Sequence, residues 1–200
     1  LVNMMELDLI VGSGGVLSHA PRRQQSAKML IDSFLPEGIT ALAVDSIFMM
    51  PQLGVMANIE KKDLAEQARI AALEVFDKDC LIRLGTCIAP VGSVESKKDV
   101  LKAELEFSSG EKKEINLDGG DLVLVEADYQ EISITLTPAK GIDVGAGVNE
   151  TIKTTVYGGQ VGIIFDCRGR PLSLSKEPNK RISELNNWSK ALNEYPSLEV

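Results

Sequence analysis

Glycines stand where the first apolar run of the chain ends and a helix is expected to begin. Residues 7–11 are nearly all apolar and lead into four small residues, Gly12, Ser13, Gly14 and Gly15. Because glycine has no Cβ, a ligand can approach the main chain closely, and the N–H groups of a following helix point toward it. Leu17 and Ser18 stand where a Rossmann motif would place its third glycine, so a dinucleotide site is the weaker interpretation. The pattern suits nucleotide binding, and a tight turn without a ligand is the alternative.

Two arginines form the second candidate site. Arg168 and Arg170 flank Gly169 in a turn that follows the apolar run 161–165. Their rigid guanidinium groups suit a carboxylate or a phosphate, so we predict an anion or partner contact; a solvent-exposed turn is the alternative. No serine or cysteine has an evident partner base, and the single histidine, His19, has no acidic or cysteine cluster beside it. We therefore predict no catalytic residue and no metal site.

The elements that must position the glycine turn alternate between strand and helix. The apolar spacing predicts strands at residues 7–11 and 39–44, a helix over 21–35, and a long helix from Pro51 to about Phe76. The charged run 60–63 is expected on the solvated face of that long helix. This alternation predicts a parallel layer.

After Cys80 the apolar residues alternate with polar ones, which is typical of antiparallel strands. The expected strands cover 101–107, 113–117, 121–126, 131–137 and 161–165. The tail, 181–195, carries a helical stripe of apolar residues and is expected to dock on this β region. The predicted fold is thus α/β plus β, with an α/β domain at 1–80 and a β-rich domain with a C-terminal helix at 81–200.

Composition restricts the partners and the compartment. The net charge is −8, which argues against binding to nucleic acid or to an anionic membrane surface. Three cysteines at Cys80, Cys87 and Cys167 fit neither a disulfide framework nor a zinc site, so a reducing, cytoplasmic setting is expected. No apolar run approaches the roughly 20 residues of a membrane span. The chain starts with Leu1 a few residues before its first strand, and we expect it to be a fragment of a longer protein.

Several separated motifs carry a family resemblance. The segments LIVGSGGVLSHAP, GITALAVD with the following PQLGVMA, and GGQVGIIFDCRGRPLSL with NNWSKAL stand in that order. Together they resemble the MutL-type accessory proteins of glutamate mutase and related aminomutases, a family distinct from the mismatch-repair protein of similar name. The resemblance implies the C-terminal half of an ATPase of the actin, Hsp70 and sugar-kinase type. The implied role is ATP-dependent, chaperone-like reactivation of a mutase whose cobalamin has become damaged, with the mutase subunits as partners.

The resemblance also implies roles for individual residues. Gly12, Gly14 and Gly15, with Ser13 among them, match the turn that contacts the adenosine end of ATP, and Gly54 matches the small residue where connecting helices of the two halves meet. The first phosphate-binding hairpin of the superfamily is absent, so ATP and Mg²⁺ are expected in the full-length parent and this chain alone is expected to be inactive.

Two alternatives remain open. The segment 141–147 around Asp143 resembles a phosphate hairpin of the DxGxT type, which would make it a circularly permuted phosphate loop. The chain could instead be a protein-binding module without nucleotide, in which the β region recognises a partner and the first 80 residues are a scaffold.

Overall fold

The computed structural model describes residues 2–60, 63–94 and 97–196. The helices are α1 (Gly15–Ser18), α2 (Arg23–Phe34), α3 (Met50–Ala57), α4 (Ala65–Val75) and α5 (Pro178–Ala191), with a 3₁₀ turn η1 (Met4–Glu6) and a π-helical turn η2 (Phe76–Cys80). The strands are β1 (Leu9–Ser13), β2 (Gly38–Asp45), β3 (Leu81–Ala89), β4 (Val91–Gly92), β5 (Leu101–Phe107), β6 (Lys112–Leu117), β7 (Leu122–Val125), β8 (Glu131–Pro138), β9 (Ile142–Asp143), β10 (Ile152–Tyr157) and β11 (Gly162–Asp166).

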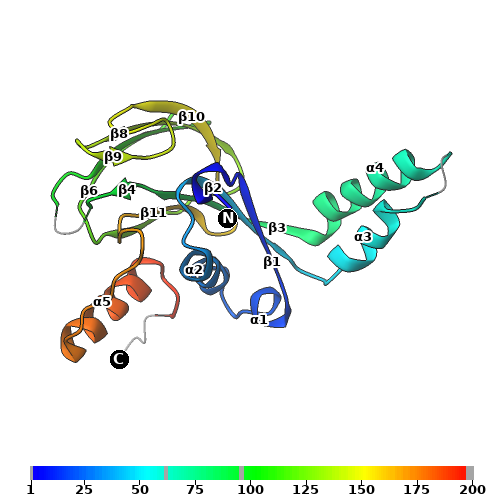
Figure 1. Ribbon diagram of the computed structural model, residues 1–200, viewed down its shortest axis with the longest axis horizontal. Coiled ribbons are helices and arrows are strands. Elements are labelled where there is room, and N and C mark those ends of the chain that lie inside the picture. Colours follow the sequence, from blue (N-terminus) through cyan, green and yellow to red (C-terminus); the bar gives the residue numbers. More distant parts are fainter. Residues whose placement is uncertain (1, 61–62, 95–96, 197–200) are drawn as a thin grey trace.

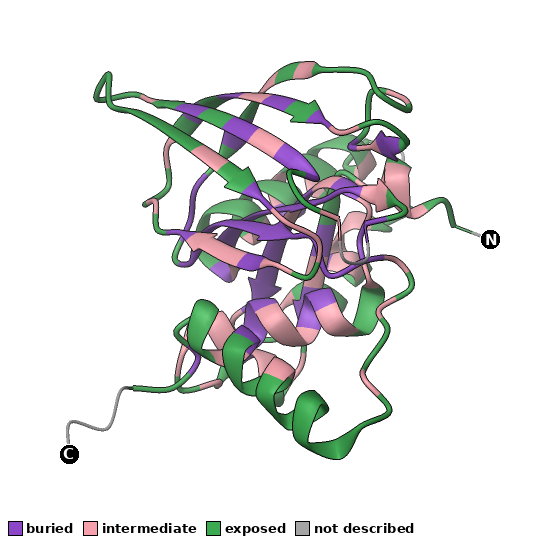
Figure 2. Ribbon diagram, turned by 90° about the vertical axis from the view of Figure 1, so that its left-hand side faces the viewer, coloured by how far each residue is buried: buried purple, intermediate pink, exposed green. Residues whose placement is uncertain are grey.

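These elements form three layers (Figure 1). A four-stranded antiparallel sheet lies uppermost, a five-stranded mixed sheet lies in the middle, and α2 and α5 lie below it. Buried residues concentrate where the layers meet (Figure 2). The predicted mixture of α/β and β structure with a C-terminal helix is confirmed. No helix in the described ranges is long and apolar enough to cross a bilayer.

The five-stranded sheet has the order β1-β2-β3-β11-β7. β1 and β2 run parallel, with α1 and α2 between them in the chain, so the predicted parallel arrangement is confirmed for this pair. The rest of the layer is mixed, because β3 runs antiparallel to β2, β11 runs parallel to β3, and β7 runs antiparallel to β11.

The predicted division at residue 80 falls inside this sheet. β2 precedes residue 80 and β3 follows it, yet the two strands pair from Gly38↔Ala89 to Asp45↔Leu81. The division into 1–80 and 81–200 stays a prediction about domains. In the described structure the two segments share one sheet.

The single long helix predicted from Pro51 to Phe76 is wrong. α3 ends at Ala57, where the side-chain amide of Asn58 donates a hydrogen bond to the carbonyl of Gly54 at 2.7 Å. Asparagine favours such local bonds to the backbone over a helix interior. The charged run 60–63 lies in the connection between α3 and α4, with Lys61 and Lys62 outside the described residues. The two helices form a hairpin that projects from the three layers (Figure 1).

Strand β3 is the central strand of the five, and the sequence pattern did not reveal it. Its last six residues, Leu84–Ala89, are buried on both faces, so apolar and polar residues do not alternate. Gly85 interrupts the run because β3 and β11 approach too closely there for any side chain. A Cβ on Gly85 would lie 1.9 Å from the carbonyl oxygen of Gly162, its register partner.

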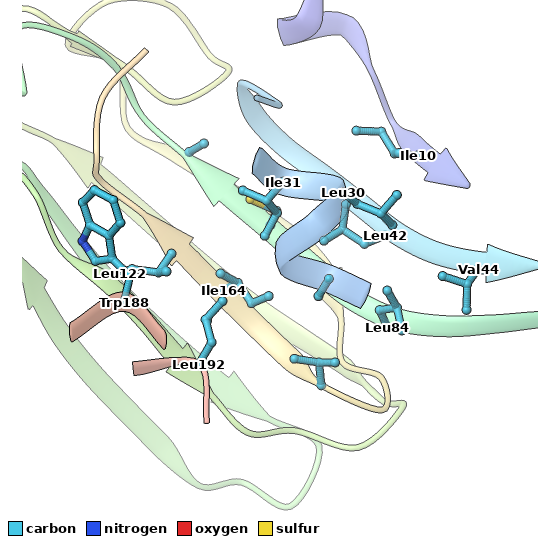
Figure 3. Packing of buried hydrophobic residues seen from close by; sticks show 14 residues of the cluster. Ile10, Leu30, Ile31, Leu42, Val44, Leu84, Leu122, Ile164, Trp188 and Leu192 are labelled. Carbon is cyan, nitrogen blue, oxygen red and sulfur yellow. The ribbon is translucent and has the colours of Figure 1, made fainter. Parts of the chain in front are cut away.

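Two apolar clusters hold the layers together. The first lies between the five-stranded sheet and the helices, with Leu30 and Ile31 of α2 packed toward Leu42 and Leu84 (Figure 3). The second lies between the two sheets, where Phe165 belongs to the same cluster as the inward-facing residues of β5 and β8. The predicted antiparallel sheet is confirmed for β5, β6 and β8, which are joined by β10.

The C-terminal helix docks as predicted, but through one end only. α5 covers Pro178–Ala191, and the capping bond that follows it runs from the Leu192 N–H to the Trp188 carbonyl. Trp188 and Leu192 are buried, whereas Ile182 is 56% exposed. The Trp188 indole N–H donates to the carbonyl of Gly120 at 3.1 Å, which attaches α5 beside β7.

The three cysteines are free and buried in the described structure, which predicts low reactivity. Burial raises the pKa of the Cys87 and Cys167 thiols well above their ordinary value, and the negative charge of Asp166 raises it further. Since the thiolate is the nucleophile, we expect iodoacetamide at pH 8 to leave both residues unmodified in the native protein. Mass spectrometry of the labelled chain checks this, with the same reaction in guanidinium chloride as the control that modifies all three. Rapid native labelling of Cys87 would contradict its place in the central strand.

Candidate functional site

The glycine turn lies at the carboxyl end of β1, directly beside the carboxyl end of β2. The parallel register pairs Ser13 with Asp45, the last residues of the two strands. The chain then turns at Gly14 into α1. In open α/β sheets, ligands are taken in the crevice outside such strand ends, so the fold places the turn at a position suited to binding.

Asp45 ties the turn to the start of the helical hairpin. Its carboxylate is fully buried and accepts a hydrogen bond from the Ser13 hydroxyl at 3.2 Å. It also accepts bonds from the backbone N–H groups of Met49 and Met50, at 3.2 and 3.0 Å, and so satisfies two donors at the beginning of α3. One carboxylate therefore fixes the position of α3 relative to the turn.

The glycines of the turn have different roles. A Cβ on Gly12 would lie 2.6 Å from a methyl carbon of Leu17 and 2.8 Å from one of Leu30, so Gly12 makes room for packing of the core. Gly14 has a φ of +126°, which side chains rarely permit, and has no atom within 4 Å of its Cβ position. Gly15 is open as far as the ring of Phe48, 4.0 Å away. Open space thus lies beside Gly14 and Gly15, and not beside Gly12.

Gly54 is not brought together with the turn. It lies on α3 with open space beside it. The hollow next to it is lined by residues of α3, α4 and η2, among them Leu53, Ala72 and Phe76. Its predicted place at a helix contact stays a prediction.

Sequence reasoning missed two residues at this site. Asp45 ends the apolar run of β2, and a carboxylate at the end of a strand that neighbours the glycine strand is a signal that the sequence contains. Phe48 has no such signal. It is 40% exposed and has a φ of +60°, an uncommon conformation for a bulky residue.

Arg168 and Arg170 bind a carboxylate of the same chain. Their side chains are only 1% and 3% exposed, and both contact Asp166, which is fully buried. Arg168 donates to the two oxygens of Asp166 at 2.8 Å each, and to Asp32 of α2 at 2.7 Å. Arg170 donates to Asp166 at 2.9 Å and to the carbonyl of Pro36 at 2.9 Å. The alternative of a solvent-exposed turn is therefore wrong for these two side chains, and contact with an external anion or partner stays a prediction.

The charges of this cluster balance one another. Burial alone would raise the pKa of Asp166, but the hydrogen bonds and charges of Arg168 and Arg170 outweigh it and hold that pKa below its ordinary value. The guanidinium carbon of Arg168 lies 4.9 Å from the ring centre of Trp188. Its Nη1 is buried without a hydrogen-bond partner in the described residues, and the ring face supplies electrostatic compensation.

The other candidate segments take no part in the glycine turn. The carboxylate of Asp143 accepts hydrogen bonds from the N–H groups of Gly145 and Gly147, at 2.8 and 3.1 Å, and so closes its own turn. In the part of the chain that the structure describes, no group of three or more histidine, cysteine or acidic side chains could hold a metal ion.

We expect Asp166→Asn to destabilise the protein by about 3–5 kcal/mol at pH 7, because it removes the carboxylate that two buried guanidinium groups share and leaves Asp32 as the counter-charge of Arg168. Equilibrium unfolding in urea measures this loss. Glu106→Gln is the matched control, since Glu106 is 56% exposed in its pair with Lys112 and should contribute little.

The same pair of proteins tests the pKa of Asp166. A carboxyl with a lowered folded pKa stabilises the protein above its unfolded pKa of about 3.9 and loses that contribution as the pH falls through the folded value. The stability difference between wild type and Asp166→Asn should therefore be constant from about pH 5 to 8 and shrink below about pH 4. A difference that grows on acidification would contradict the assignment.

The amino-terminal part of the chain, which contains the glycine turn and α3, matches a known family. Residues 2–73 match the family model described as MutL protein. Comparisons with curated proteins and with solved structures found no match, so the actin-like assignment stays a prediction. The resemblance to the MutL-type family of glutamate mutase accessory proteins, predicted from the sequence motifs, is confirmed over residues 2–73.

Proposed function

We propose that the chain is part of an ATP-dependent, chaperone-like reactivating factor for a cobalamin-dependent aminomutase such as glutamate mutase. The observation that carries the proposal is the open glycine turn at the carboxyl ends of two parallel strands, within the segment that matches the MutL family. The factor works in the cytoplasm, with the mutase subunits as its partners.

The residues present fit the adenosine part of a nucleotide. Gly14 and Gly15 leave the main chain open, and the exposed ring of Phe48 borders the same space. Ser13 is held to Asp45, which fixes the turn before any ligand arrives. A turn that is already ordered loses little conformational entropy on binding, which favours affinity.

In this proposal the chain binds and orients, while the phosphate chemistry belongs to the actin-like parent. Bound ATP and Mg²⁺ would supply the free energy that drives the factor between two conformations. Gly14 and Gly15 would hold the adenosine end, and Asp45 would connect it to α3. The chain alone is expected to bind nucleotide without turning it over.

We expect Gly15→Val to weaken binding of a non-hydrolysable ATP analogue at least about tenfold, equivalent to about 1.4 kcal/mol. The added methyl groups enter the open space between the turn and Phe48, where the ligand is proposed to lie. Gly15 is the first residue of α1 and has no positive φ, so valine should not strain the backbone. Calorimetric titration measures affinity, and thermal melting without ligand should give an unchanged midpoint.

Gly12→Ala is the matched control within the same turn. Its methyl group meets Leu17 and Leu30, so it should lower the melting temperature without entering the ligand space. If Gly15→Val binds the analogue as tightly as wild type does, the glycine turn is only a turn and the adenosine assignment is wrong.

A protein-binding module is the second candidate function, and the α3–α4 hairpin favours it. The hairpin projects from the layers (Figure 1), and its apolar residues are unusually exposed, with Val55 at 75%, Leu73 at 56% and Ile70 at 47%. Large apolar side chains left exposed on one projecting element favour a role in binding a partner. The exposed hairpin places the contact surface within the first 80 residues and not on the β region, and under this alternative the occupant is the mutase itself, bound without nucleotide.

Under this alternative, Leu73→Glu should weaken binding of purified glutamate mutase about tenfold or more, as truncation of a central apolar contact does. Val148→Glu is the control, because Val148 is also 56% exposed but lies beyond β9, outside the hairpin. Surface plasmon resonance in the absence of nucleotide measures both. Equal binding by the two variants, or binding that requires ATP, would contradict this second function.

A further inference from the structure

A hollow of about 310 Å³ lies beside the amino end of β1, the opposite end of that strand from the glycine turn. Leu9 of β1 and Ala41 and Ala43 of β2 line it from the five-stranded sheet. Tyr129, which precedes β8, and Tyr157, which ends β10, line it as well. Sites for small organic ligands are hollows of about 300–1,000 Å³ with mainly apolar and aromatic walls. The size and lining of this hollow therefore suit a ligand of one or two rings.

The two tyrosines form a stacked aromatic pair at the surface. Their ring centres lie 6.0 Å apart, and the ring planes are inclined by 18°. Tyr129 is 59% exposed and Tyr157 is 43% exposed, so both rings keep surface that a ligand can cover. Aromatic rings prefer such offset stacking on other flat rings, and tyrosine supplies a large contact area with few rotatable bonds to order. The pair therefore favours a flat aromatic ligand over a branched aliphatic one.

Hydrogen bonds fix the backbone that carries this pair. The buried hydroxyl of Thr86 on β3 donates to the carbonyl of Tyr157 at 2.8 Å and accepts from its N–H at 3.3 Å. The N–H of Gly158 donates to the carbonyl of Gln130 at 3.1 Å, which joins the two segments that carry the tyrosines. The walls of the hollow are therefore in place before a ligand arrives, which lowers the entropic cost of binding.

Among the described residues that line the hollow, Arg83 of β3 is the charged one. Its guanidinium carbon lies 5.6 Å from the ring centre of Tyr129, and the group also pairs with Asp77 of η2. This ion pair is exposed, by 36% at Arg83 and 55% at Asp77. Exposed ion pairs contribute little stability, so an incoming carboxylate can replace Asp77 at small cost. The nearby Asp128 lines an adjacent hollow and not this one, so the charge facing the ligand is positive.

We propose that this hollow binds a small planar aromatic carboxylate. The aromatic ring packs on Tyr129 and Tyr157 and covers the apolar strand residues beneath, while the carboxylate accepts hydrogen bonds from the guanidinium group of Arg83. Arginine suits this role because its planar group can donate two parallel N–H bonds to one carboxylate. The site is separate from the glycine turn, so the proposal holds or fails independently of nucleotide binding.

Titration of the 200-residue chain with 2-naphthoate, followed by the NMR signals of the ligand, tests the proposal. Wild type should bind it with a Kd of about 1 mM or tighter, the range that a ligand of this size can reach. The neutral 2-naphthamide has the same shape and should bind about tenfold more weakly, and the cationic 2-naphthylmethylamine more weakly still. Decahydro-2-naphthoate keeps the charge without the flat ring and should bind about threefold more weakly than 2-naphthoate.

Two substitutions separate the roles of charge and ring. Arg83→Gln should lower the affinity for 2-naphthoate to that for 2-naphthamide and leave the affinity for the amide unchanged. Arg69→Gln is its matched control, since Arg69 is also exposed and paired with a carboxylate, on α4. Tyr129→Leu should weaken the acid and the amide alike, by about two- to tenfold. Tyr195→Leu is the control for it, because Tyr195 is 66% exposed and does not line the hollow.

Thermal melting of each variant without ligand should match wild type, because the changed side chains are exposed at least in part. Failure of wild type to bind 2-naphthoate at about 10 mM overturns the proposal. Equal or tighter binding of the amine also overturns it, because the hollow then does not select an anion. If both Arg83→Gln and Tyr129→Leu bind the acid as wild type does, the ligand lies elsewhere and the site is wrong. Equal losses of acid and amide binding in Arg83→Gln would overturn the pairing of Arg83 with the carboxylate.

Discussion

The buried carboxylate of Asp166 is the interaction on which the packing of the helical layer depends. It lies at the end of β11, and the two arginines that neutralise it extend to other elements. Arg168 reaches Asp32 on α2 and stacks on Trp188 of α5, while Arg170 reaches the carbonyl of Pro36. A charge is costly to bury, so the cluster is stable only when all its partners are in place. This requirement couples the positions of α2, α5 and the sheet, and through α2 it supports the strand that carries the glycine turn.

Asp45 is a second buried carboxylate that connects separate elements. It also ends a strand, is fully buried, and receives its hydrogen bonds from two different elements. Asp166 is neutralised by guanidinium groups, whereas Asp45 is satisfied by a hydroxyl and backbone N–H groups. The first arrangement joins layers that must stay together. The hydrogen bonds of Asp45 fix the glycine turn relative to the start of α3.

Elements with a clear apolar periodicity could be predicted from the sequence, and the structure shows why other elements could not. The helix at α2 and the strands β2 and β5 follow the expected apolar spacing, whereas β1 lies two residues later than predicted and includes Gly12 and Ser13. β3 is buried on both faces and has a glycine at its centre, so it lacks alternation. The break between α3 and α4 depends on Asn58 and on the packing of two helices against each other.

Some features of the candidate site could likewise be predicted from the sequence, and others could not. The glycine turn was visible because it depends on adjacent residues. The contacts of Arg168 could not be predicted, because one of its partners, Asp32, is 136 residues away in the chain. Phe48 lies between residues that are held by hydrogen bonds to Cys80 and Asp45. Its positive φ could not be predicted, because phenylalanine rarely adopts this conformation.

The α3–α4 hairpin begins and ends at one point of the sheet, since Asp45 and Leu81 are register partners. Its apolar cluster of Leu53, Ala72 and Cys80 shares no residue with the clusters on either side of the five-stranded sheet. The hairpin therefore packs as a unit of its own between two paired strands, and a short turn would close the same gap. Substitutions on its surface should leave both main cores intact, so its solvent-facing residues are constrained by what the hairpin contacts and not by the packing of the sheet.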